Sequence, residues 1–134
     1  MIELVIPSKP FGKQRPRIGK FGAYTPQKTI NYETLVKYTF ITKYPDFKPF
    51  EGAVSIDVLA VFAPPKSYRK KKQKELLVKP YTKKPDYDNI AKIVSDALNT
   101  LAYKDDAQVA RAVQNKVYGE VDKVVIQIEE ISEG

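Results

Sequence analysis

Alternating apolar and polar positions predict four β-strands. Apolar residues occupy every second position of residues 2–6 and of residues 54–62, and a period of two places those side chains on one face of a strand. Two further strand-like runs cover residues 108–118 and 121–131. Only Gly119 and Glu120 separate them, which favours a tight hairpin. The sequence therefore predicts four strands, with the last two paired to each other.

Helix-start signals and helical spacing predict two further elements. Thr25 followed by Pro26 is typical of a helix start, and the segment up to Tyr44 carries apolar residues at helical spacing. Those residues are Ile30, Leu35, Tyr38 and Ile41. Ser67 is expected to cap a short, very basic helix that ends near Leu77.

A third helix is predicted over residues 89–101, with Asp88 at its N-cap, because the apolar residues form one stripe. The stripe consists of Ile90, Ile93, Val94, Ala97, Leu98 and Leu101. The other side of the helix holds Asp88, Lys92 and Asp96. Residues 9–24 are rich in glycine and basic residues, contain two prolines, and are predicted to form a loop.

This order of elements predicts a single α+β domain over residues 1–134. We expect a mixed, largely antiparallel sheet of about four strands with helices packed on it. A chain of 134 residues with 43% hydrophobic residues is long enough to bury one ordinary core.

Composition limits the chemistry that is possible. The chain has no cysteine and no histidine, which excludes disulfides, thiolate nucleophiles, imidazole bases and the usual zinc sites. Carboxylates, lysines, hydroxyls and a hard metal ion remain. No apolar run is suited to a signal core or a membrane span, and the absence of cysteine suits a reducing compartment. The sequence therefore predicts a cytoplasmic protein without a membrane partner.

Charge indicates a polyanionic partner. Lys and Arg outnumber Asp and Glu by 23 to 16, a net charge of +7. Solvated surface lysines would explain that total equally well, but the basic residues are concentrated in segments beside tyrosines, which favours phosphate binding. The candidate contacts to the phosphates of a nucleic acid are Lys13, Arg15, Arg17, Lys20, Arg69, Lys70, Lys71, Lys72, Lys83 and Lys84.

Aspartates in two short segments are candidate metal ligands. Asp86 and Asp88 are separated by one residue, and on an extended segment they could approach one hard cation from the same side. Asp105 and Asp106 precede a predicted strand. Each aspartate alone is explained as a cap or a turn residue. Together they crowd like charges, which a cation would relieve.

The strings that carry these residues resemble a known family. Lys84-Pro-Asp-Tyr-Asp-Asn-Ile-Ala-Lys92, followed by Asp96-Ala-Leu-Asn99 and Tyr103-Lys-Asp-Asp-Ala-Gln-Val109, resembles the RusA family of Holliday-junction resolvases. Gly12-Lys-Gln-Arg-Pro-Arg17 and Tyr24-Thr-Pro26 are similar to the arm of phage and prophage members.

The resemblance implies a homodimeric, magnesium-dependent endonuclease that nicks four-way DNA junctions symmetrically, with manganese as a possible substitute and no small-molecule cofactor. The essential carboxylates would be Asp86, Asp88 and Asp106, and Asp105 would be a neighbouring carboxylate that matches an aspartate of the family. Lys92 would be a catalytic lysine at the scissile phosphate, although ion pairing within the helix is an alternative role.

Helix length raises a question about the third carboxylate. A helix over residues 89–101 is about 20 Å long, and the five residues up to Asp106 reach about 17 Å. Either the chain turns straight back along the helix, or a partner subunit supplies Asp106. The sequence leads to the hypothesis that the metal site is completed at or near a dimer interface.

Two other functions remain open at this point. A non-catalytic basic DNA-binding module would use the lysines and need no metal. A metal nuclease for single-stranded nucleic acid would use tyrosines as stacking platforms, although packing is the more common role of such tyrosines. The tyrosines concerned are Tyr24, Tyr68, Tyr81 and Tyr87.

Overall fold

The computed structural model describes residues 1–132, and its centre is a four-stranded sheet. The strands β1 (Ile2–Ile6), β4 (Val54–Phe62), β5 (Val109–Tyr118) and β6 (Lys123–Glu130) lie in the order β1-β6-β4-β5. β1 and β4 are antiparallel to β6, whereas β4 and β5 are parallel. The predicted α+β fold with a mixed sheet is confirmed.

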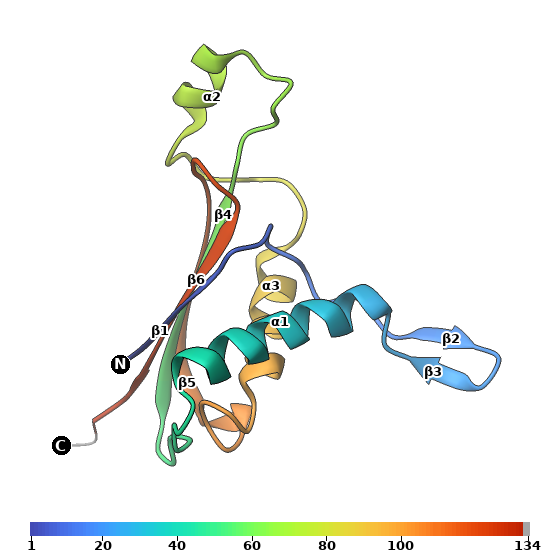
Figure 1. The fold of residues 1–134 in the computed structure, drawn as a ribbon, viewed down its shortest axis with the longest axis vertical. Helices are drawn as coiled ribbons and strands as arrows, with labels where there is room; N and C mark the ends of the chain where they lie inside the picture. The colour runs from blue at the N-terminus through green and yellow to red at the C-terminus, as the bar shows by residue number, and fades with distance from the viewer. Residues whose placement is uncertain (133–134) are drawn as a thin grey trace.

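One face of the sheet forms the core. Two helices, α1 (Gln27–Lys43) and α3 (Tyr87–Leu98), lie on the same side of the sheet (Figure 1). Every second residue of β4 from Val54 to Phe62 is buried, as the alternation predicts, while Asp57 is exposed on the opposite face. The predicted stripe of α3 is also buried, apart from Leu101, which follows the helix and is half-buried.

The predicted hairpin between the last two strands is wrong. β4 lies between β5 and β6, so the connection crosses over the end of β4. The N–H of Gly119 donates to the carbonyl of Phe62 at 3.0 Å, and the N–H of Ala63 donates to Asp122 at 2.8 Å. A Cβ atom on Gly119 would overlap the Val61 side chain. The glycine therefore permits a close crossing rather than a two-residue turn.

The apolar face predicted for the first helix is wrong at three of its four residues. Ile30, Tyr38 and Ile41 are 42%, 69% and 49% exposed, whereas Leu35 is half-buried and packs against the core. The buried residues of α1 are Thr29, Tyr32, Val36 and Phe40. Both sets have helical spacing, so periodicity alone did not distinguish them. The N-cap position is occupied by Pro26, and no side chain caps the helix.

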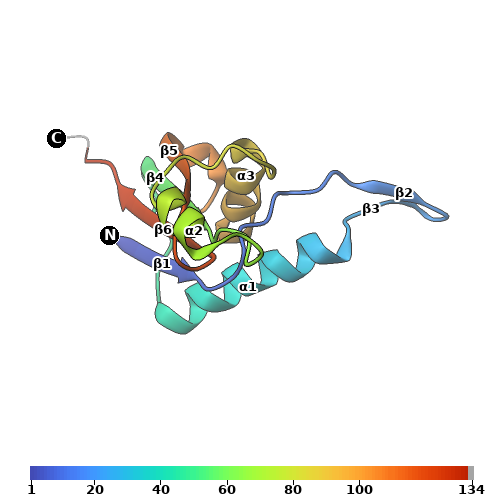
Figure 2. The ribbon, with the colours of Figure 1, turned by 90° about the horizontal axis from the view of Figure 1, so that it is seen from above.

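The segment predicted to be a loop contains a β-ribbon. β2 (Arg17–Gly19) and β3 (Gly22–Tyr24) pair antiparallel and project away from the rest of the protein (Figure 2). Residues 15–24, which we call the arm, are all exposed. Because neither face of the ribbon is buried, its sequence carries no apolar alternation from which strands could be predicted.

The basic helix α2 (Lys70–Leu76) lies beyond one end of the sheet (Figure 1). Its N-cap is Arg69 rather than Ser67, and no side chain caps it. The chain then runs beside the end of β5, where Tyr81 donates its N–H to the carbonyl of Lys116 at 2.9 Å, and continues to α3. Within residues 1–132, none of the helices combines the length and apolarity needed to cross a membrane.

Candidate active site

The exposed side of α3 carries a row of charged side chains. Asp88, Lys92 and Asp96 follow one another at intervals of four residues, so they lie on one helix face. Asp88 and Lys92 are exposed, and Asp96 is half-buried. Because the buried stripe of α3 fixes the rotation of the helix on the sheet, the charged row is held toward solvent.

Asp86 lies at the N-cap of α3, the position that the sequence predicted for Asp88. Asp88 instead belongs to the first helical turn. The backbone at Asp86 is extended, with φ −69° and ψ 147°. Both of its carboxylate oxygens accept hydrogen bonds from Nζ of Lys84, at 2.8 and 2.9 Å, and this contact holds the pKa of Asp86 below its usual value. The pair is exposed, so it adds little to stability and is easily displaced.

After α3 the chain turns back along the helix. The buried Tyr103 donates its hydroxyl to the carbonyl of Ser95 at 2.7 Å, and the short 3₁₀ helix η1 (Asp106–Gln108) follows. Asp105 caps η1 by accepting a hydrogen bond from a backbone N–H at 3.0 Å. The turn brings Asp106 back toward the part of α3 that carries Lys92 and Asp96.

Asp106 lies among other charged groups. Its hydrogen bond with Asp105 raises the pKa of Asp106, and partial desolvation and the charge of Asp96 raise it further, while Lys92 lowers it. The pKa of Asp105 is lowered, first by the backbone N–H of Ala107. Crowded carboxyl groups repel one another unless a proton or a cation compensates their charge. The third predicted carboxylate therefore lies beside the charged row of α3, and neighbouring carboxyl groups disfavour its negative charge.

The residues fit a hard cation in chemistry but only partly in position. Carboxylate oxygens are ligands that magnesium accepts, and the chain has no thiol or imidazole to attract softer metals. Within residues 1–132, however, no three acidic side chains lie close enough together to hold a metal ion. Asp86 lies at the start of α3, Asp88 lies in its first turn and Asp106 lies near Lys92 and Asp96, so the three carboxylates surround the helix without forming a closed cluster.

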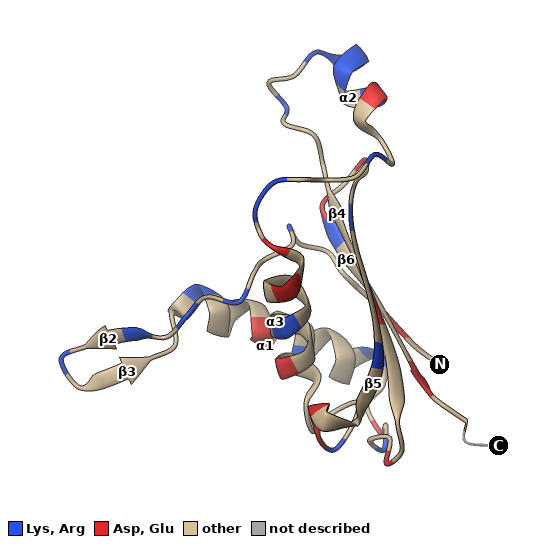
Figure 3. Ribbon diagram, turned by 180° about the vertical axis from the view of Figure 1, so that it is seen from behind, with Lys and Arg blue, Asp and Glu red and all other residues tan. Residues whose placement is uncertain are grey.

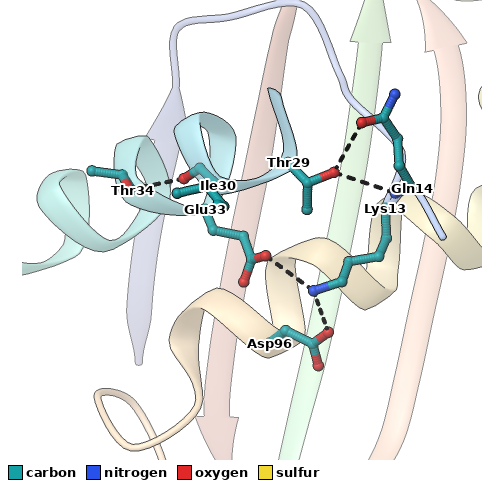
Figure 4. Close-up of polar contacts among 7 residues, drawn as sticks. All are labelled: Lys13, Gln14, Thr29, Ile30, Glu33, Thr34 and Asp96. Atoms are coloured by element: carbon teal, nitrogen blue, oxygen red, sulfur yellow. Dashed lines mark hydrogen bonds and ion pairs between the residues drawn. The ribbon is translucent and has the colours of Figure 1, made fainter. Parts of the chain in front are cut away.

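An ion network ties the residues just before the arm to this side of α3. Nζ of Lys13 lies 3.0 Å from Glu33 of α1 and 3.1 Å from Asp96 of α3 (Figure 4). The next residue, Gln14, accepts a hydrogen bond from the buried Thr29 at 3.2 Å. The sequence did not predict this network, because its members are far apart along the chain and follow no common pattern. Lys13 was predicted to bind DNA, but its ammonium is held by two carboxylates.

Replacing Lys13 with methionine is expected to lower the free energy of unfolding by about 1–2 kcal/mol at neutral pH, because Glu33 and Asp96 would then face each other unneutralised. Burial lowers the pKa of Lys13, but the hydrogen bonds and charges of the two carboxylates outweigh it and raise the pKa above 10.5. The stabilisation is therefore complete below pH 10.5 and is lost as the pH rises through the raised value.

Urea unfolding at several pH values measures this effect, with Lys28→Met on the exposed side of α1 as the matched control. Equal losses in the two variants at neutral pH would show that the network does not stabilise the fold.

Most of the predicted DNA contacts lie on exposed basic surfaces (Figure 3). One surface is on the arm, one is on and just before α2, and one precedes α3. Their members are Arg15, Arg17 and Lys20 on the arm, Arg69, Lys70, Lys71 and Lys72 around α2, and Lys83 and Lys84 before α3. Phosphates could approach all three surfaces without displacing core residues.

Two of the tyrosines considered as stacking platforms already contact other side chains. Tyr81 stacks on Phe62 with ring centroids 3.7 Å apart. The ring of Tyr68 lies 4.0 Å from Nζ of Lys72. Tyr24 and Tyr87 are 51% and 62% exposed. Tyr81 therefore has the packing role that is common for half-buried tyrosines.

Comparison with known proteins agrees with the resemblance in the sequence. Residues 7–129 match the family model described as Endodeoxyribonuclease RusA. The chain is also similar to the uncharacterized protein YqaN of Bacillus subtilis (strain 168), with 36% identity over 140 residues that cover 98% of this chain and 97% of YqaN. The family match includes the arm, α3 and the turn that carries Asp106. The chain therefore belongs to the RusA family of endodeoxyribonucleases.

Proposed function

We propose that the protein is a magnesium-dependent endonuclease that resolves four-way DNA junctions by hydrolysing phosphodiesters. The observation that supports this most directly is the exposed row of Asp88 and Lys92 on α3, with Asp86 at the start of the row and Asp106 beside it. Carboxylates and a lysine on or beside one rigid helix are groups that metal-assisted phosphodiester hydrolysis can use.

Asp86, Asp88 and Asp106 would hold the cation, with Asp105 as a neighbouring carboxylate. Magnesium, or manganese in its place, supplies an activated water and neutralises phosphate charge when bound. The ammonium of Lys84 contacts both oxygens of Asp86 in an exposed ion pair, so a bound cation would displace it. Lys92 would contact the scissile phosphate from the middle of the row and stabilise charge that develops there.

The basic surfaces would bind the DNA backbone and position it over α3. Contacts to phosphates carry little sequence information, so the shape of the DNA would dominate selection of the substrate. We propose that the protein acts as a homodimer in the cytoplasm, in recombination and repair, because two matched subunits would explain paired symmetrical cuts.

A cleavage assay tests the proposal. A synthetic four-way junction and a linear duplex of the same sequence are incubated with the protein in magnesium and, separately, in chelator. We expect cutting of the junction in magnesium alone, with little cutting of the duplex. Binding without any cutting would favour a non-catalytic DNA-binding module, and equal cutting of both DNAs would remove the junction selectivity.

A subunit-mixing experiment tests whether each metal site uses carboxylates of one chain. Asp106 lies near Lys92 of its own chain, and Lys92 is one helical turn from Asp88. We therefore expect a mixture of Asp88→Asn and Asp106→Asn subunits to remain inactive, because each chain lacks one ligand of its own site. If the mixed dimers regain activity, the site is shared between subunits.

A further inference from the structure

The tip of the arm exposes apolar side chains that no other element covers. Phe21 is 97% exposed and Ile18 is 89% exposed, the two highest values among the large hydrophobic residues that the structure describes. Nζ of Lys20 lies 5.9 Å from the centre of the Phe21 ring. Exposed apolar residues that stand singly are common on proteins, so the position and the charge of this tip decide what it could bind.

The turn of the ribbon fixes the position of that ring. Gly19 pairs with Gly22, so Lys20 and Phe21 form the two-residue turn between the strands. Gly22 has φ +106°, a conformation that favours glycine. The backbone thus presents Phe21 at the outermost point of a two-stranded ribbon, a shape that fits into a DNA groove.

The root of the arm is anchored to the helix that carries the carboxylates. The N–H of Lys13 donates to the carbonyl of Asn89 at 2.9 Å, and its ammonium contacts Asp96. A Cβ atom on Gly12 would lie 2.9 Å from Cβ of Pro85, so the chain is tightly seated at the start of α3. From Lys13 to Phe21 the chain has eight residues, which reach about 26 Å when extended. The position of the tip is therefore linked to the position of the charged row.

The charge of the arm indicates what the tip binds. No Asp or Glu occurs between Glu3 and Glu33. The basic residues in that interval are Lys9, Lys13, Arg15, Arg17, Lys20 and Lys28. The basic residues of this segment complement the phosphates of a nucleic acid, and the apolar tip complements the flat faces of its bases. The arm is therefore suited to bind nucleic acid.

We propose that the arm inserts Phe21 between bases at the branch point of a DNA junction, while Lys20 and Arg17 contact the flanking phosphates. Apolar side chains on DNA-binding proteins act as wedges between base steps, and unstacking costs least where the stack is already interrupted. Phe21 then provides preference for branched DNA over duplex. This inference rests on the proposed function, because it takes branched DNA as the substrate.

The test measures binding in chelator, where no cutting interferes. A four-way junction and a matched linear duplex carry the fluorescent base 2-aminopurine, at the branch point and at the equivalent position. We expect the intact protein to brighten the junction probe. Phe21→Ala is expected to lower junction affinity by about tenfold or more, to leave duplex affinity unchanged, and to abolish the brightening. Phe21→Trp is expected to preserve both.

Two control variants separate wedge insertion from other effects. Lys20→Ala is expected to weaken binding to junction and duplex alike, because a phosphate contact does not depend on branching. Val78→Ala removes another exposed apolar side chain, 85% exposed and outside the arm, and should change neither affinity. Unchanged melting temperatures would show that the variants are folded.

Three results would overturn the inference. Phe21→Ala could bind the junction as tightly as the intact protein, could retain the brightening, or could alter the sedimentation coefficient, which would show that the tip contacts a second copy of the chain. Failure of the proposed nuclease function would give a different result. The protein would then never cut DNA in magnesium, but it would still unstack the branch point through Phe21.

Discussion

Replacing Asp88 with asparagine is expected to slow junction cleavage by about a hundred- to a thousand-fold in magnesium. The substitution keeps the shape of the side chain and an oxygen that can accept from the N–H of Asn89, the 3.0 Å contact that Asp88 makes in the fold. It removes only the charge that would bind the cation. The single-turnover cleavage rate, measured at saturating protein, gives the effect on chemistry alone.

The matched control for this substitution is Asp57→Asn. Asp57 is exposed in the middle of β4, on the face of the sheet opposite α3, so the same chemical change is made away from the charged row. We expect normal cleavage by this variant and normal junction binding by both. Equal loss of cleavage in the two variants would show that Asp88 has no special role.

The second large effect concerns stability. Gly119→Ala is expected to lower the free energy of unfolding by about 1–3 kcal/mol, because the new methyl group would overlap the buried Val61 side chain where the chain crosses over β4. Gly52→Ala is the control, since a Cβ there meets only the Glu130 carboxylate, at an ordinary 3.5 Å. Urea unfolding of both variants measures the difference.

Val61→Ala provides an independent check on that explanation. If overlap with the valine is the cause, the cost of Gly119→Ala should largely disappear in the Val61→Ala background, and a double-mutant cycle would give a coupling energy of about 1 kcal/mol or more. Additive effects would mean that Gly119→Ala acts through the backbone rather than through the contact with Val61.

The fold was predictable where an element buries only one of its faces, because such burial requires apolar residues at regular intervals. β4 and α3 each bury one face, so the alternation of residues 54–62 and the stripe from Ile90 to Leu98 gave their type and orientation. The arm buries neither face and was missed. α1 carries two apolar stripes, and only packing against the sheet and α3 decides that the Val36 stripe is buried and the Tyr38 stripe is not.

Strand order depends on contacts that a local pattern does not contain. The short link between β5 and β6 has the length of a hairpin, yet its N–H and carbonyl partners lie on the end of β4. The family was recognisable because the residues in and around α3 form continuous sequence motifs, which can be compared without knowing the fold. The match to the family model confirms this resemblance. The roles of Asp86, Asp88, Asp106 and Lys92 stay predictions, and the Lys13 network required the fold.

The parallel pairing of β4 with β5 also constrains how the chain folds. Residues 63–108 lie between these neighbours and contain both α2 and α3. Closing a loop of that size costs chain entropy before any contact between the strands repays it. α3 and the turn after it can form locally, because Tyr103 bonds back to Ser95, but they are placed beside the sheet only once the loop has closed. We therefore expect the charged row and the basic surfaces to reach their final relative positions in a late step of folding, so that a partly folded chain would bind DNA with little selectivity.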